Sequence, residues 1–246
     1  MARVRIGTSG WSYPAWVGPF YPAGTSPARM LGVYASTFDT VEAHATYRRL
    51  PAATALARWV DAVPPTFRFA AKAHMGITHR RDLDGVEDRV AAFYAAVAPL
   101  GETLGPVLFS LPHHEPDLVR LDRILAAIPR PGAAFDVAPA WDRADVLDRL
   151  DAAGATLVVT DPRSTGRSGP ARSTGRSGPG DSTIPSIGPL AYVRLRKGEY
   201  TPAELDAWAE RLDKVVADDR DAYVFFKHDD EATGPVLAKE LARRGR

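Results

Sequence analysis

Charged and polar side chains recur at every second position in three β-rich runs of this sequence. Because successive side chains of a strand point to opposite faces, each run presents one polar and one apolar face. The polar faces carry Glu42, His44 and Thr46 in the first run, Lys72 and His74 in the second, and Arg194 and Arg196 in the third. Two carboxylates, Asp136 and Asp161, lie at or near the ends of other β-rich runs. If the apolar faces pack against helices, all these groups line one interior.

The mixture of carboxylates and cations suits proton transfer on an anionic ligand, because buried charges need a partner or a function. Glu42 is the best candidate for a general acid or base, and Asp136 is a second proton-transfer group. Lys72 has two interpretations. Burial and nearby arginines would favour a neutral, Schiff-base amine, whereas pairing with Glu42 on the adjacent strand would make it a ligand-binding cation. The pairing is favoured. Arg194 and Arg196 would bind the anion, and Lys227, whose phase is ambiguous, could add another cation.

Aromatic residues follow the first, second and fifth β-rich runs, and Trp11 and Tyr13 come directly after the first. Aromatic faces at a barrel mouth suit stacking against a sugar or a base. Packing of the loops onto the barrel rim explains the same residues equally well, so both interpretations stay open.

A metal site could use carboxylate and imidazole groups of the same interior, as metal-dependent isomerases and endonucleases do. The candidate ligands are Glu42, His44, His74, Asp136 and His228. Several cations point into the same space and would repel a divalent ion, and the sequence has no closely spaced histidine motif. We therefore predict no metal here, and metal dependence remains an alternative.

Eight β-rich runs alternate with helical patterns along the chain. The predicted strands are Val4–Ser9, Thr40–Thr46, Phe67–His74, Val107–Leu111, Ala133–Val137, Thr156–Asp161, Ala191–Arg196 and Tyr223–His228. The predicted helices are Pro27–Phe38, Ala52–Ala62, Val86–Ala98, Asp117–Ala127, Arg143–Ala153, Pro202–Ala217 and Gly234–Arg243. This alternation predicts an α/β fold, a single (β/α)8 barrel of the TIM type over residues 1–246, with its site at the C-terminal strand ends. An open doubly wound sheet is the alternative, but Gly7–Trp11 matches a glycine-rich phosphate loop poorly.

The connection after the sixth predicted strand has no helical pattern. Instead, the eight residues from Arg163 to Pro170 recur from Arg172 to Pro179. A tandem repeat of Gly, Ser, Arg and Pro cannot bury a core, so we expect residues 163–179 to form a disordered loop in place of a helix. A duplication in a tolerant surface loop is favoured over a basic lid across the barrel mouth.

The composition is that of an ordinary globular protein. The chain has 246 residues, of which 45% are hydrophobic and 25% charged. A net charge of +1 gives no basic field, so nucleic-acid binding is not expected. The lack of cysteine excludes disulfides, thiolate nucleophiles and cysteine-ligated zinc. No signal peptide or membrane-length apolar run is evident, so we expect a cytoplasmic protein without a membrane partner.

Five segments, in their order and spacing, resemble the YecE-like barrel proteins, known as domain of unknown function 72. They are IGTSGWSYPAW, FDTVEAHATYRRLP, FRFAAKAHMGITH, GPVLFSLP and YVFFKHDDEATGP. The resemblance covers nearly the whole chain and implies a TIM-type barrel, but it implies no reaction and no cofactor. The positions that match the family pattern are Gly10, Trp11, Tyr13, Glu42, Thr46, Arg49, Lys72, Thr78, His79, Asp161 and Arg194.

The chain also departs from the family pattern. His44 replaces the usual Asn, Ser110 replaces a Gln, and Lys227-His228 takes the place of paired Asn residues, as in part of the family. The segment Asp136–Trp141 is shorter than its family counterpart and lacks that segment's Arg and His. Chemistry that depends on that Arg-His pair is therefore not expected here.

Two classes of function follow. The first is an enzyme of the hydrolase, lyase or isomerase type that acts on an anionic, sugar-like or phosphorylated small molecule. Its further ligand-binding residues would be Arg49, His74, His79, Asp161 and His228. The second is a non-catalytic barrel that binds a ligand or single-stranded nucleic acid. The sequence specifies no oligomeric state.

Overall fold

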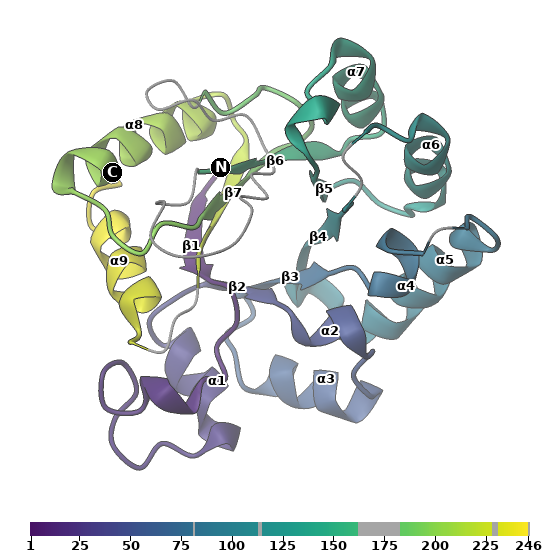
Figure 1. Cartoon of the computed structure of the whole chain (residues 1–246). Helices are drawn as coiled ribbons and strands as arrows, with labels where there is room; N and C mark the ends of the chain where they lie inside the picture. Colours follow the sequence, from purple (N-terminus) through teal and green to yellow (C-terminus); the bar gives the residue numbers. More distant parts are fainter. Residues whose placement is uncertain (81, 113–114, 162–182, 228–230, 246) are drawn as a thin grey trace.

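Eight parallel strands form one sheet in the order β1-β8-β7-β6-β5-β4-β3-β2 and curve into a barrel that helices surround (Figure 1). This computed structural model describes residues 1–80, 82–112, 115–161, 183–227 and 231–245. The strands are β1 (Val4–Thr8), β2 (Thr40–Ala43), β3 (Arg68–Lys72), β4 (Leu104–Ser110), β5 (Ala133–Asp136), β6 (Thr156–Thr160), β7 (Leu190–Leu195) and β8 (Asp221–Phe226). The predicted (β/α)8 barrel of the TIM type is confirmed.

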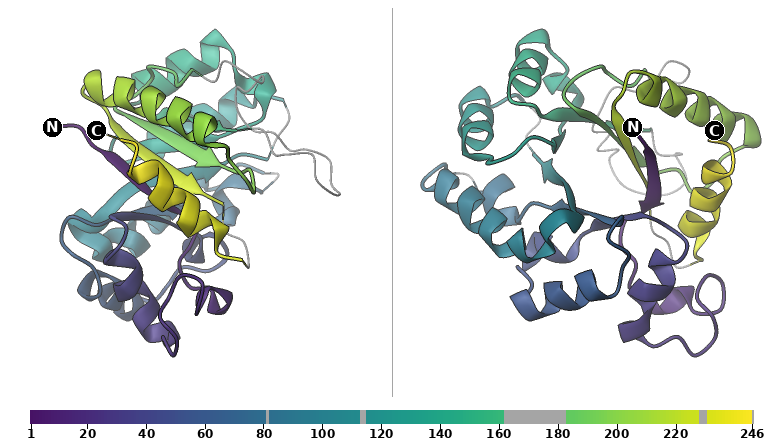
Figure 2. Two further views of the ribbon diagram at one scale, coloured as in Figure 1. Left: turned by 90° about the vertical axis from the view of Figure 1, so that its left-hand side faces the viewer. Right: turned by 180° about the vertical axis from the view of Figure 1, so that it is seen from behind.

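The helices lie outside the strands, as the side view in Figure 2 also shows. They are α1 (Pro27–Ala35), α2 (Ala45–Arg48), α3 (Ala53–Asp61), α4 (Met75–Thr78), α5 (Val86–Val97), α6 (Leu118–Ala127), α7 (Ala144–Ala152), α8 (Pro202–Ala217) and α9 (Thr233–Ala242), with 3-10 turns η1 (Pro14–Trp16), η2 (Ala98–Thr103) and η3 (Pro139–Trp141). Capping residues in the sequence determine where several of these helices begin. At α8, Thr201 accepts a hydrogen bond from the Glu204 N–H while Glu204 reaches back to the Thr201 N–H, and Pro202 fits the first turn.

Each strand ends one to three residues earlier than the sequence predicts, and at two of them this changes the environment of predicted site residues. β2 ends at Ala43 and β3 at Lys72, and the short helices α2 and α4 follow at once. His44 and His74 are consequently the residues that precede these helices, not strand residues. The alternation of polar and apolar residues continues past both strand ends, so periodicity alone placed them too late.

An apolar layer fills the barrel beneath its C-terminal end. Its residues are Ala70, Leu108, Ala134, Val158, Leu190, Tyr192, Tyr223 and Phe225, which all lie on strands and form a cluster separate from the larger core under the helices. Such a filled interior is typical of this barrel type. This apolar layer excludes water from beneath the polar groups at the C-terminal end of the barrel.

The barrel closes between β1 and β2 through a narrow seam. Ser9 and Glu42 form an isolated parallel bridge, and the Gly10 N–H donates to the Glu42 carbonyl oxygen at 2.9 Å. The approach is close because Gly7 has no side chain: a methyl group there would lie 2.1 Å from the Thr40 carbonyl oxygen. The seam therefore requires glycine at position 7.

Two predictions concern segments outside the described residues. The repeat at 163–179 lies there, as does His228. Residues 183–189, which lead into β7, contain no helix. Within the described ranges, no helix is both long and apolar enough to cross a membrane.

Candidate functional site

Arg194 joins two carboxylates from opposite parts of the barrel. Its Nη2 donates to Glu42 Oε1 at 2.9 Å, and its Nη1 donates to Asp136 Oδ2 at 2.5 Å. The three residues come from β7, β2 and β5 and are buried. Arg194 Nε is also buried and has no hydrogen-bond partner in the described part of the chain. Both Nη groups are thus committed to the protein, which leaves Arg194 as a bridge within the site.

Glu42 is held by four donors. Besides Arg194, it accepts from His44 Nε2 at 2.5 Å, Ser9 Oγ at 3.1 Å and Tyr192 Oη at 2.7 Å. Burial alone would raise the pKa of Glu42, but the charge of Arg194 and the hydrogen bond from His44 outweigh it and hold the pKa well below its ordinary value. The lowered pKa makes this carboxylate a weaker base, and its four donors fix its position, whereas proton transfer by Glu42 stays a prediction.

Asp136 keeps one carboxylate oxygen without a partner. Oδ2 accepts from Arg194 and, at 3.5 Å, from Ser110 Oγ. Oδ1 is buried and has no hydrogen-bond partner among the described residues. A buried acceptor without a donor is costly, so a donor group of a ligand or a water that reached Oδ1 would stabilise the site.

Lys72 lies at the end of β3 without the expected pairing to Glu42. Its ammonium has no hydrogen bond or ion pair to any residue that the structure describes, and Nζ lies 4.3 Å from the centroid of the Tyr47 ring. Burial and the charge of Arg194 lower the pKa of Lys72, and the opposing effects of Glu42 and Asp136 do not compensate. The predicted Glu42–Lys72 salt bridge is therefore wrong, because Glu42 is already occupied by its four donors.

Arg196 lies just beyond β7 and adds another charge to this group. We call Glu42, Lys72, Asp136, Arg194 and Arg196 the charged cluster. Its side chain is half-buried and close enough to Glu42 and Lys72 to lower the pKa of both. Asp161 fixes its backbone by accepting the Arg196 N–H at 2.5 Å, and Asp161 also accepts from the Tyr200 hydroxyl. Burial raises the pKa of Asp161, although these two donors oppose the shift.

Asp161 does not join Glu42, Lys72 and Arg194, although the sequence predicts that the four converge. It orders the connection between β7 and α8 instead. Asp161 is thus placed to support Arg196, and within the described residues it makes no hydrogen bond to the Arg194 side chain.

Several other predicted ligand-binding residues lie on the rim around Lys72. Thr46 is buried and donates to the Lys72 carbonyl oxygen at 2.6 Å, and Tyr47 Oη lies 3.2 Å from His79 Nε2. His74 accepts from the Gly76 N–H at the start of α4. Arg49 is exposed directly after α2. These residues shape the edge of the site, and His74 caps a helix there.

The aromatic residues after β1 differ in their surroundings. Trp11 is only 8% exposed and packs edge-on against Trp59, with ring centroids 4.9 Å apart. Tyr13 is half-buried and donates to the Ser9 carbonyl oxygen at 2.7 Å, and burial followed by the charge of Glu42 raises its pKa to about 12. Packing of the loop on the rim accounts for Trp11, whose ring is not open to a ligand.

The sequence interpretation missed Tyr192 and Ser9 as members of the site. Both are completely buried and donate to Glu42. Tyr192 shares the inward phase of Arg194, which was a usable signal, whereas Ser9 reaches Glu42 through the β1–β2 seam, which periodicity does not reveal.

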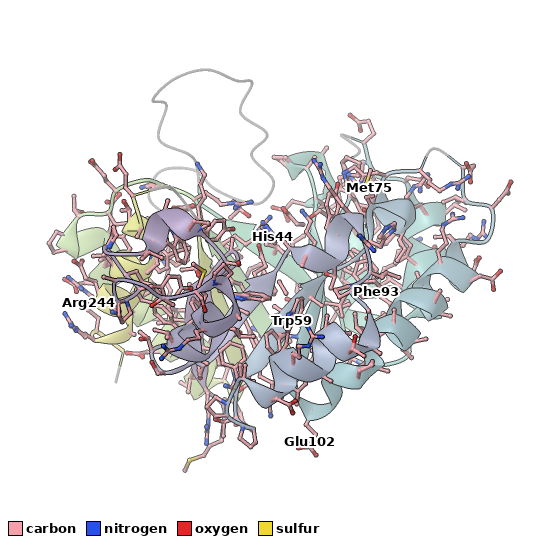
Figure 3. The ribbon with its side chains drawn as sticks, turned by 90° about the horizontal axis from the view of Figure 1, so that it is seen from below. His44, Trp59, Met75, Phe93, Glu102 and Arg244 are labelled. Atoms are coloured by element: carbon pink, nitrogen blue, oxygen red, sulfur yellow. The ribbon has the colours of Figure 1, made fainter. Side chains whose placement is uncertain are left out.

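The charged cluster lies at the C-terminal face of the barrel. Figure 3 shows His44 and Met75, which follow β2 and β3, far from Glu102, which precedes β4. No group of three or more His, Asp or Glu side chains in the described ranges is placed to hold a metal ion.

Comparisons with known proteins agree with this architecture. A solved DUF72 family protein from Thermotoga maritima MSB8 is 22% identical, with a TM-score of 0.76 and 98% of each chain covered. A second, from Enterococcus faecalis V583, is 19% identical, with a TM-score of 0.74 over 98% of this chain and 94% of that one. The UPF0759 protein YunF of Bacillus subtilis (strain 168) is 32% identical over 115 residues, which are 44% of this chain and 40% of that relative.

The family model described as "Protein of unknown function DUF72" matches residues 5–246. It therefore covers both the strands that hold the charged cluster and the helices around them. The chain belongs to the DUF72 family.

Proposed function

We propose that the C-terminal face of this barrel is the working site of an enzyme that acts on an anionic, sugar-like or phosphorylated small molecule. Support comes from the gathering of charged groups at the face that carries catalytic residues in barrels of this type. The proposal rests chiefly on one observation. Lys72 is a partly buried cation with no counter-ion among the described residues, and Arg196 lies close to it.

The charge balance of the cluster favours an anion. Glu42 and Asp136 are both paired with Arg194. A protonated Lys72 adds a positive charge that has no counter-ion among the described residues, and Arg196 lies close to it. A cation without a counter-ion in a partly desolvated site is unfavourable until an anion neutralises it.

Each side chain suits a separate task. Arg196 binds the anionic group, because guanidinium matches carboxylate and phosphate geometry. Asp136 Oδ1 accepts a hydroxyl of the ligand. His44, half-exposed and hydrogen-bonded to Glu42, transfers protons in the reaction, and Glu42 keeps it in place.

Thermal unfolding in phosphate, compared with chloride at equal ionic strength, tests the anion site. Phosphate at a hundred times its Kd should stabilise the protein by about 2.7 kcal/mol. Arg196→Ala should abolish most of that gain, whereas Arg58→Ala, which alters an exposed arginine of α3, should keep it.

Equal stabilisation by chloride and phosphate, or a full phosphate effect in Arg196→Ala, would contradict the anion site. Stabilisation by divalent metal ions alone would favour the metal-dependent alternative.

A further inference from the structure

We propose that the Lys72 amine is a nucleophile that forms a Schiff base, so the substrate class is an anionic aldehyde or ketone. This inference deepens the proposed function and rests on it for the anionic part of the substrate. It concerns the same face of the barrel but assigns Lys72 a covalent step.

The placement of Lys72 is the first argument. A structural lysine in a partly buried position normally has a carboxylate partner. Both carboxylates near Lys72 are instead directed to Arg194, and Glu42 already accepts hydrogen bonds from four donors. The amine therefore lies above the face of the Tyr47 ring, at the end of β3 and next to the apolar layer of the barrel.

The surroundings raise the fraction of Lys72 that is unprotonated. Burial disfavours the ammonium, and Arg194 and Arg196 repel it, so the pKa of Lys72 is lowered. The Tyr47 ring attracts a cation and acts in the opposite direction, but such contacts contribute only about 0.5–2 kcal/mol. The neutral amine is the form that attacks a carbonyl.

The step balances without an oxidant or a reductant. The nitrogen lone pair attacks the carbonyl carbon, the C=O π electrons move to oxygen, and a proton passes from nitrogen to that oxygen to give a carbinolamine. A second proton on this oxygen breaks the C–O bond, and water leaves as the C=N bond forms. His44 is the proton carrier on the neighbouring strand end, and its hydrogen bond to Glu42 holds the imidazole ring in place.

Reductive trapping of the wild-type protein tests this role without knowledge of the substrate. The protein is treated with glycolaldehyde and sodium cyanoborohydride at pH 7, and labelling is mapped by peptide mass spectrometry. The internal controls are Lys197, Lys214, Lys227 and Lys239, the other lysines of the chain. Lys72 should be labelled several-fold faster than exposed Lys214, because its lowered pKa leaves a larger unprotonated fraction at pH 7.

Labelling of Lys72 at or below the rate of Lys214 would overturn the inference, whether the cause is protonation or inaccessibility. Glyceraldehyde 3-phosphate should then label Lys72 faster than glycolaldehyde does, and Arg196→Ala should remove this advantage. An equal rate for both aldehydes overturns the anionic part of the substrate class.

The two proposals fail separately. Phosphate stabilisation with slow Lys72 labelling would remove the Schiff base and keep the anion site. Fast labelling without any phosphate effect would keep the nucleophile and remove the anion site.

Discussion

Arg194 holds two buried carboxylates that would repel each other without it. The sequence identified Glu42, Asp136 and Arg194 as inward residues from the alternation in their strands. It could not identify the partners, because adjacency along the sheet suggested Lys72 for Glu42. The actual partner lies 152 residues away, and distances across a barrel interior leave no periodic signal.

Replacing Arg194 by Ala should lower the free energy of unfolding by about 3–5 kcal/mol, because Glu42 and Asp136 would stay buried without a cation. Urea unfolding followed by circular dichroism measures the change. Arg123→Ala, which removes an exposed pair with Glu87, is the control and should cost about 0–1 kcal/mol. Similar losses in both variants would show that the bridge is not a stabilising feature.

At the scale of elements, hydrophobic periodicity located all eight strands and most of the helices. It failed at α2 and α4, each of four residues, which begin directly at strand ends. Helices this short carry no period that a sequence can display. Their effect on the site is direct, since they place His44, Thr46 and His74 around the rim and not inside the barrel.

The β1–β2 seam gives a prediction at the same scale. Gly7→Ala should lower the free energy of unfolding by about 1–3 kcal/mol. The added methyl group would lie 2.1 Å from the Thr40 carbonyl oxygen and 2.8 Å from the Tyr34 hydroxyl. Gly32→Ala is a matched control inside α1, where the nearest atom is 3.6 Å from the new methyl group. The free energy of unfolding of Gly32→Ala should rise by up to about 1 kcal/mol, because Ala has a higher helix propensity than Gly. Thermal unfolding of both variants measures these changes. Unchanged stability in Gly7→Ala would mean that β1 and β2 are packed less closely at this position than described.

The response of the whole molecule to acid follows from the lowered pKa of Glu42. In the unfolded chain Glu42 binds a proton near its ordinary value of 4.5, whereas the folded protein resists protonation to lower pH. Stability from Glu42 is therefore complete above that value and is lost as pH falls below it. Asp161, whose pKa is raised, contributes with the opposite sign.

Urea unfolding at a series of pH values should show a loss of stability below pH 4.5 that is shallower in Glu42→Gln. Glu102→Gln, exposed at the opposite face, should keep the slope of the parent protein. A parent and a Glu42→Gln variant with the same slope would contradict the lowered pKa.

The β1–β8 ladder, in which Val4 faces Ala222, also sets an order of events on the ribosome. The first strand to emerge must wait for the last before its outer edge is paired, and Glu42 must wait for Arg194. A nascent chain that stops short of β7 can form helices and neighbouring strand pairs, yet it exposes a barrel edge and carries an uncompensated carboxylate at the seam. Only a chain that extends through β7 acquires the guanidinium bridge, so the charged cluster assembles late in synthesis, and chains arrested earlier remain accessible to chaperones and proteases.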